Sequence, residues 1–255
     1  MNVKQLALAL SMALLTGHSP AHAGEIKVLS TVAAKSVMEE LIPQFERESG
    51  HKVVIQFGTT AVLKRQIDAG EDFDVAIFTP PGLIDEMVTQ GKIAADSRTD
   101  FARTSVGVAV RAGTPKPDIG SVEAFKKSLV AAKSIGYTDP ALGGTSGIYL
   151  RELVDRLGIA GDMNPKTKLS AGIPALVESV ATGEVEIGML QISEIVPDPR
   201  LELVGSLPKG FEKSTVIAVG LRTNSKEPSA GRALIRFLGS PAVWPVIKRK
   251  GMEPG

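Results

Sequence analysis

Two glycine- and hydroxyl-rich turns have the residue types best suited to binding a small anion. The first, Gly58-Thr59-Thr60, follows a β-branched stretch over 52–57 and precedes a helical pattern that begins at Ala61. Glycine lets a ligand approach the backbone, and the first free N–H groups of a helix carry partial positive charge. An ordinary capped turn has the same composition, because a threonine hydroxyl can cap the helix instead.

The second turn, Gly143-Gly-Thr-Ser-Gly147, opens a predicted helix in the other half of the chain. It contributes the hydroxyls of Thr145 and Ser146. Thr31 ends the first predicted strand and adds another hydroxyl. Two such turns facing each other would bind an anion from both sides, which a single capped turn would not do.

Strands and helices alternate along most of the chain. This alternation predicts right-handed βαβ units and mainly parallel sheets. We expect strands over residues 25–31, 52–57, 74–79, 104–111, 134–138, 186–191, 201–207 and 214–221.

The predicted fold is α/β with two lobes, each a mainly parallel sheet flanked by helices. We expect residues 24–103 plus 222–255 to form lobe 1 and residues 112–213 to form lobe 2. The segments 104–111 and 214–221 are the predicted hinge crossings. A ligand then belongs in the cleft between the lobes, outside the carboxyl ends of the strands, with hinge closure around it.

The first 23 residues have the pattern of a cleaved secretory signal. Lys4 precedes a short apolar core over 6–15, and Ala21-His22-Ala23 fits a small-x-small cleavage site before Gly24. The apolar core is too short for a membrane span. We therefore expect export to a periplasm without membrane insertion; a retained membrane anchor is the alternative.

Composition excludes several classes of function. The 29 basic and 28 acidic residues nearly balance, which argues against nucleic-acid or membrane-surface binding. The chain has no cysteine, and two of its three histidines lie in the predicted signal. A thiolate or histidine metal site and a Ser-His triad are therefore disfavoured, and we expect no metal or organic cofactor.

The chain resembles the type II periplasmic binding proteins, and within them the molybdate-binding-protein family. The resemblance covers essentially the whole predicted mature chain, through the order and spacing of several weak motifs. These motifs are Ile26-Lys-Val-Leu, Gln56-Phe-Gly-Thr-Thr60, Leu63-Lys-Arg-Gln-Ile67-Asp-Ala-Gly70, Asp74-Val-Ala-Ile77, Asp139-Pro140 with Gly147-Ile-Tyr149, Ile187-Gly-Met-Leu-Gln191 and Phe237-Leu-Gly-Ser-Pro241.

The resemblance implies an oxyanion site built from both lobes. Thr60 matches a ligand serine of the family, and Ser146 and Ile173 match positions that contribute backbone contacts. Two departures argue against molybdate: Ala33 stands where the family has its other ligand serine, and Gln191 where it has a tyrosine. Losing a buried hydroxyl leaves an oxyanion oxygen unsatisfied, so we expect a different anion.

Cations near the predicted cleft favour an organic polycarboxylate. Lys35 follows the first strand by one turn, and Arg103 precedes the first crossing. With the hydroxyls of Thr31, Thr59 and Thr145, they could hold two or three carboxylates, with arginine offering a bidentate fork. Solvated surface charges are the alternative for both cations.

A branch of this family that includes aconitate isomerase is the most similar in pattern. The similarity lies in Tyr137-Thr-Asp-Pro140, Gly144-Thr-Ser-Gly147 and Gln191-Ile-Ser-Glu194. It implies a monomeric, cofactor-free enzyme that interconverts trans- and cis-aconitate by moving an allylic proton. A capped helix start is the alternative interpretation of the last motif.

Such an enzyme needs a base within reach of the carbon skeleton of its substrate. Glu194, Lys35 and Asp139 are the candidates, unranked, and Asp139 could instead only brace its turn. The rival hypothesis is a non-catalytic receptor that delivers a small anion to an ABC transporter, since fold does not determine function. A receptor for a tetrahedral oxyanion such as molybdate is the third hypothesis, and Ala33 and Gln191 argue against it.

Overall fold

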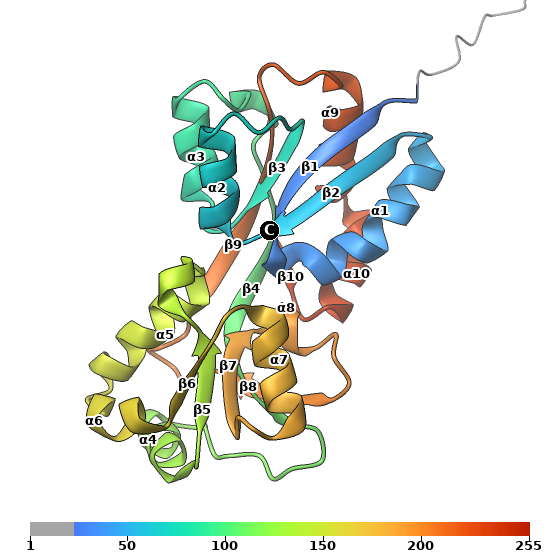
Figure 1. Ribbon diagram of the computed structural model, residues 1–255. Helices are drawn as coiled ribbons and strands as arrows, with labels where there is room; N and C mark the ends of the chain where they lie inside the picture. The colour runs from blue at the N-terminus through green and yellow to red at the C-terminus, as the bar shows by residue number, and fades with distance from the viewer. Residues whose placement is uncertain (1–22) are drawn as a thin grey trace, which may run out of the picture.

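The computed structural model describes residues 23–255. The predicted signal segment, apart from Ala23, therefore lies outside the described residues. Two lobes stand one above the other, the upper containing both ends of the described chain and the lower containing the middle of the chain (Figure 1).

Within residues 23–255, ten strands form the sheets. They are β1 (Glu25–Thr31), β2 (Lys52–Gly58), β3 (Val75–Phe78), β4 (Thr99–Arg111), β5 (Ile135–Thr138), β6 (Thr167–Ser170), β7 (Ile187–Gln191), β8 (Leu201–Ser206), β9 (Ser214–Leu221) and β10 (Glu253–Pro254).

The α-helices cover these strands. They are α1 (Lys35–Ser49), α2 (Thr60–Asp68), α3 (Gly82–Thr89), α4 (Val122–Ala131), α5 (Thr145–Arg156), α6 (Ala160–Met163), α7 (Ile173–Thr182), α8 (Ile192–Ile195), α9 (Pro228–Leu238) and α10 (Trp244–Arg249). A short 3-10 helix, Val32–Ala34, joins β1 to α1.

Each lobe contains a three-stranded parallel unit. In the upper lobe β1 pairs with β2 and β3, and in the lower lobe β5 pairs with β6 and β7. Antiparallel strands join the two units in the order β2-β1-β3-β9-β4-β7-β5-β6. The predicted α/β architecture is therefore present, with antiparallel strands between the two parallel units.

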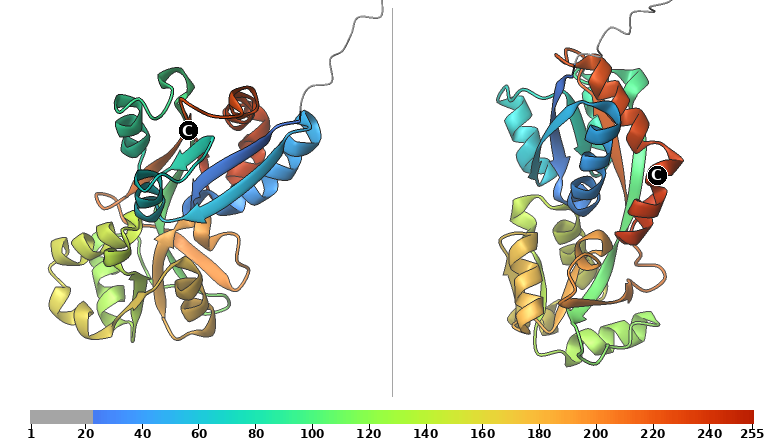
Figure 2. Two further views of the ribbon diagram at one scale, coloured as in Figure 1. Left: turned by 45° about the horizontal axis from the view of Figure 1, so that its top comes forward. Right: turned by 90° about the vertical axis from the view of Figure 1, so that its right-hand side faces the viewer.

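Strand β4 runs through both lobes (Figure 2, right). Residues 99–105 pair with β9 in the upper lobe, and residues 106–109 pair with β7 in the lower lobe. The chain thus crosses at the Ser105–Val106 bond, without a loop between the lobes.

The second crossing differs from the prediction. Strand β9 pairs along its whole length with β3 and β4 in the upper lobe. The passage back from the lower lobe therefore falls before Ser214, not within 214–221. Apolar strand patterns do not distinguish a crossing strand from one that ends at the lobe boundary.

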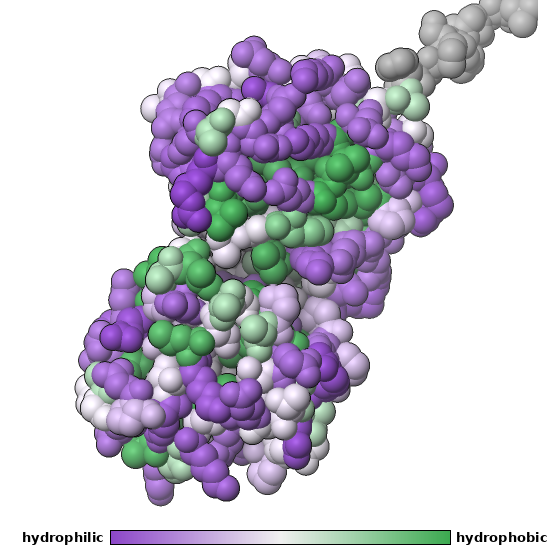
Figure 3. Space-filling view, viewed as in Figure 1, coloured by the Kyte–Doolittle hydropathy of each residue, from purple (hydrophilic) through white to green (hydrophobic). Residues whose placement is uncertain are grey.

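Apolar side chains form a separate core on each side of both parallel units. The space-filling view shows a largely polar surface, a narrow waist between the lobes and an apolar patch where Figure 1 draws β1 and β2 (Figure 3). The edge strand β2 carries Val54, which is 50% exposed. Within residues 23–255, no helix has the length and apolar character needed to cross a membrane.

Asp74, at the start of β3, is hydrogen-bonded to β1 and to the C-terminal part of the chain. Its carboxylate accepts hydrogen bonds from the Lys27 backbone N–H (2.9 Å), the Ser225 hydroxyl (2.7 Å) and the Lys226 backbone N–H (3.0 Å). Asp74→Ala leaves these partly buried donors unpaired and should lower the free energy of unfolding by about 3 kcal/mol. Urea titration measures this, with the exposed Asp162→Ala as control; equal midpoints for the two variants would contradict the assigned role.

Candidate functional site

The carboxyl ends of all six parallel strands meet at one cavity between the lobes. Its volume is about 120 Å³, room for an ion or a small metabolite. The lining residues are Thr31, Val32, Ala33, Thr59, Thr60, Thr79, Thr138, Leu142, Gly144, Thr145, Ser146, Gly172, Ile173, Gln191 and Glu194.

Three helices begin at this cavity. The first residues of α2, α5 and α7 are Thr60, Thr145 and Ile173, and all three line it. The first N–H groups of a helix have no partner within the helix and carry the positive end of its dipole. Because three such ends converge, the cavity attracts an anion without needing a lysine or arginine in its wall.

The hydroxyls of the first predicted anion turn are engaged within the protein. Thr59 caps α2: its Oγ1 accepts from the Val62 N–H (3.3 Å) and donates to the Leu142 carbonyl (3.3 Å). The Thr60 Oγ1 donates to the Thr79 carbonyl at 2.7 Å. Since each hydroxyl has one proton, neither of these can also donate to a ligand while these bonds last.

The structure brings most of the predicted site residues together. The following eight line the cavity: Thr31, Thr59, Thr60, Thr145, Ser146, Ile173, Gln191 and Glu194. They come from both lobes, and they include one of the three candidate bases, Glu194.

Three predicted site residues lie outside the cavity. Lys35 is exposed on α1, 3.7 Å from Glu39. Arg103 is exposed on β4, opposite Glu253 of β10. Asp139 caps the 3-10 turn after β5, where its Oδ1 accepts from the Ala141 N–H at 2.9 Å. None of the three lies in the cavity wall, so direct contact with a ligand inside the cavity does not fit this geometry.

Two threonines that sequence reasoning missed also line the cavity. Thr79 follows β3 and Thr138 ends β5, and they are only 5% and 6% exposed. Both come at the carboxyl end of a predicted apolar strand, the place where open α/β sheets bind ligands. Their position at the ends of these strands could have identified both threonines as site residues from the sequence.

Glu194 is the only ionisable side chain among the described residues that line the cavity. Its Oε2 accepts a hydrogen bond from the Gln191 backbone N–H at 3.0 Å, which favours the charged form. Desolvation of the carboxyl group is the larger effect and raises the pKa of Glu194 to about 8. Near neutral pH the group is therefore mostly protonated but close to its titration point.

The cavity opens into a hollow on each side. The α1-side hollow shares Val32, Ile173 and Glu194 with the cavity and also contains Lys35 and Arg200. The α2-side hollow shares Thr60, Thr79 and Thr145 with it and contains Lys64 and Lys213. A ligand larger than the cavity could extend into either hollow, toward cations.

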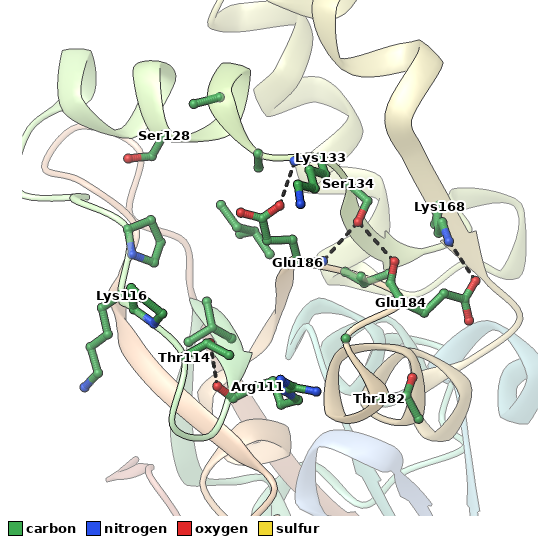
Figure 4. A pocket seen from close by; sticks show the side chains of 18 residues that line it. Arg111, Thr114, Lys116, Ser128, Lys133, Ser134, Lys168, Thr182, Glu184 and Glu186 are labelled. Carbon is green, nitrogen blue, oxygen red and sulfur yellow. Dashed lines mark hydrogen bonds and ion pairs between the residues drawn. The ribbon is translucent and has the colours of Figure 1, made fainter.

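A larger hollow lies elsewhere, at the amino ends of β5 and β7 (Figure 4). It measures about 850 Å³. Polar groups there largely satisfy one another: Lys168 pairs with Glu184 at 2.9 Å, and Glu186 accepts from the Lys133 N–H at 2.7 Å. Because it lies at the end of the strands away from the helix N-termini, we assign the functional site to the smaller interlobe cavity.

The lobes touch beside the cavity. Ala61 of α2 packs against Gly143, where an added Cβ would lie 2.6 Å from the Ala61 Cβ. On the other side, the Ser36 hydroxyl donates to the Ser193 carbonyl at 3.3 Å. The described conformation is therefore closed around the cavity.

No group of three or more histidine, cysteine, aspartate or glutamate side chains suited to a metal ion occurs within residues 23–255.

Two lobes that enclose a cavity between facing strand ends define a protein that closes around a small solute. The chain belongs to the bacterial extracellular solute-binding protein family, whose model matches residues 26–253. This family assignment confirms the resemblance found in the sequence.

Named relatives include an enzyme and a binding protein. The chain is 31% identical to the aconitate isomerase of Pseudomonas sp. over 252 residues, covering 95% of this chain and 94% of that protein. It is 28% identical to the molybdate-binding protein ModA of Azotobacter vinelandii over 260 residues, covering 98% and 97%.

A solved structure shares the fold. The periplasmic molybdate-binding protein of Azotobacter vinelandii superposes with a TM-score of 0.75 at 19% identity, covering 90% of this chain and 99% of that one. The likeness confirms the predicted two-lobed binding-protein fold.

Gly143→Ala should hinder closure. The new methyl group collides with Ala61, and the positive φ of +72° adds about 1–2 kcal/mol of backbone strain. Gly158→Ala is the matched control, with φ +69° and nothing within 4 Å of the added Cβ. Small-angle X-ray scattering should show a larger radius of gyration for Gly143→Ala alone, reduced again by Ala61→Gly. Identical scattering from all variants would contradict the assigned contact.

Glu194 should make stability depend on pH. Between its ordinary pKa near 4.5 and about 8, the folded state keeps a proton that the unfolded state has released. The free energy of unfolding therefore falls as pH rises through this window, by at most about 1.4 kcal/mol per pH unit. Urea titrations from pH 5 to pH 8 should show this slope in wild type relative to Glu194→Gln; parallel curves would refute the raised pKa.

Proposed function

We propose that this protein is a periplasmic isomerase that interconverts trans- and cis-aconitate by an allylic proton shift. The observation that carries the proposal is Glu194: a carboxyl group with a pKa near 8, in the wall of a cavity built for an anion. A general base works best when its pKa lies near the working pH. The similarity to the aconitate isomerase of Pseudomonas sp. supports the same reaction.

Glu194 would act as both base and acid. In its ionised form it removes a proton from the CH₂ carbon of the substrate, and the C=C bond shifts by one position as a dienolate-like anion forms. The protonated Glu194 then returns the proton to the carbon at the other end of the allylic system. Nothing is oxidised or reduced, and neither metal nor organic cofactor takes part in this scheme.

The protein would stabilise the anionic intermediate through neutral donors. The N-termini of α2, α5 and α7 face the cavity, and negative charge developing on the substrate carboxylates is stabilised there. The outer carboxylates of a tricarboxylate would reach toward Lys35 in the α1-side hollow or Lys213 in the α2-side hollow. These lysines would attract the substrate without entering the cavity.

A non-catalytic receptor for a small anion is the second candidate function. The family and the similarity to molybdate-binding proteins favour it. The helix N-termini and hydroxyls suffice for binding, and such a receptor would act as a monomer that hands its ligand to an ABC transporter. Ala33 and Gln191 line the cavity where molybdate-binding relatives were expected to have ligand hydroxyls, so an organic acid suits it better than molybdate.

Proton NMR of trans-aconitate in D₂O with residues 24–255 tests the enzyme directly. Appearance of the cis isomer, with exchange of the CH₂ signal, is expected. Glu194→Gln should slow turnover by about a hundredfold or more while still binding the substrate, because it removes the base and keeps the shape. Asp139→Asn is the control, since Asp139 caps a turn outside the cavity.

Two outcomes would reject the isomerase. One is an unchanged trans-aconitate spectrum, with a rise in melting temperature for another anion; this would favour the receptor. The other is full turnover by Glu194→Gln, which would leave the reaction but remove the assigned base.

A further inference from the structure

Three buried side-chain atoms lack a hydrogen-bond partner within residues 23–255. They are Thr79 Oγ1, Gln191 Oε1 and Thr215 Oγ1. Buried polar groups almost always have a hydrogen-bond partner, so each of these unpaired atoms needs an explanation. Two of them, Thr79 and Gln191, line the interlobe cavity, and their side chains come from opposite lobes.

Thr79 is held in place while its hydroxyl stays free. Its backbone carbonyl accepts the hydrogen bond from Thr60 Oγ1 at 2.7 Å, which fixes the end of β3 against the start of α2. The hydroxyls of Thr59 and Thr60 donate to carbonyls of the protein. The Thr79 hydroxyl, in contrast, has a proton to offer.

Gln191, the N-cap residue of α8, lies across the cavity from Thr79. It is 3% exposed, and its backbone N–H donates to Glu194 at 3.0 Å. Its side-chain amide carries donors at one end and an acceptor at the other. A half-turn of the last side-chain bond presents the donors to an anionic oxygen.

We infer that Thr79 and Gln191 form a two-lobed recognition pair for one carboxylate group of the ligand. Thr79 is a binding residue that was not among the site residues predicted from the sequence or from the family resemblance. Because one donor comes from each lobe, the Thr79 hydroxyl and the Gln191 amide NH₂ bind the same carboxylate together only when the lobes close around the ligand. A solute without an oxygen at this place leaves both groups unpaired and is rejected. The carboxylate as ligand group rests on the proposed function; the role of Thr79 rests on the cavity.

Substitution by valine tests the inference, because it removes the hydroxyl and keeps the shape. Thr79→Val should weaken binding about tenfold to a hundredfold, the range for a hydrogen bond to a charged group. Thr215→Val is the matched control: it removes an equally buried, equally unpaired hydroxyl that does not line the cavity. Neither variant should lower the melting temperature of the ligand-free protein, since each removes an unsatisfied polar atom. Thr79→Ser should keep wild-type affinity.

Isothermal titration calorimetry with trans-aconitate and with molybdate provides the measurement. The expected result is weaker binding in Thr79→Val alone. Unchanged affinity in Thr79→Val, equal loss in Thr215→Val, or a wild-type protein that binds neither probe would each overturn the inference. Molybdate binding that Thr79→Val weakens, without aconitate turnover, would reject the isomerase and the carboxylate assignment while retaining Thr79 as a ligand contact.

Discussion

Strand β4 is hydrogen-bonded to β9 in the upper lobe and to β7 in the lower one, and this shared strand determines how the two parallel units face each other. Because it crosses without a loop, the carboxyl ends of both units point into the same gap. Six strand ends and three helix N-termini then converge, as they would not if each lobe folded independently. The anion-binding character of the cavity is thus a consequence of topology.

The electrostatics of the cavity follow from the absence of lysine and arginine among the described residues of its wall. Helix N-termini supply partial positive charge, and cations lie only in the flanking hollows. With no lysine or arginine among the described lining residues, desolvation dominates at Glu194 and raises its pKa. The same burial that makes Glu194 a usable proton carrier near neutral pH lowers the stability of the folded chain as that group ionises. A shifted pKa and unpaired buried polar atoms are typical of a functional site.

Some of the contacts that hold the lobes closed are weak. The interlobe bonds Thr59–Leu142 and Ser36–Ser193 are long, at 3.3 Å each, and Ala61 meets Gly143 with no room for a larger side chain. Such contacts define the geometry of the closed form but stabilise it weakly. A ligand that satisfies polar groups from both lobes therefore has the larger influence on the equilibrium between open and closed forms.

The sequence by itself determined the alternating strands and helices, the two hydroxyl-rich turns and the family pattern, because periodicity and turn chemistry are local. The rule that ligands bind at strand ends and the family resemblance together predicted eight residues that line one cavity. The sequence could not rank Glu194 above Lys35 and Asp139, since their difference is burial: one lines the cavity, one is solvated on α1 and one caps a turn. Nor could it separate the engaged hydroxyls of Thr59 and Thr60 from the free one of Thr79, or locate the second crossing. Those depend on partners far apart in the chain, and only the tertiary structure decides which groups meet and which remain unpaired.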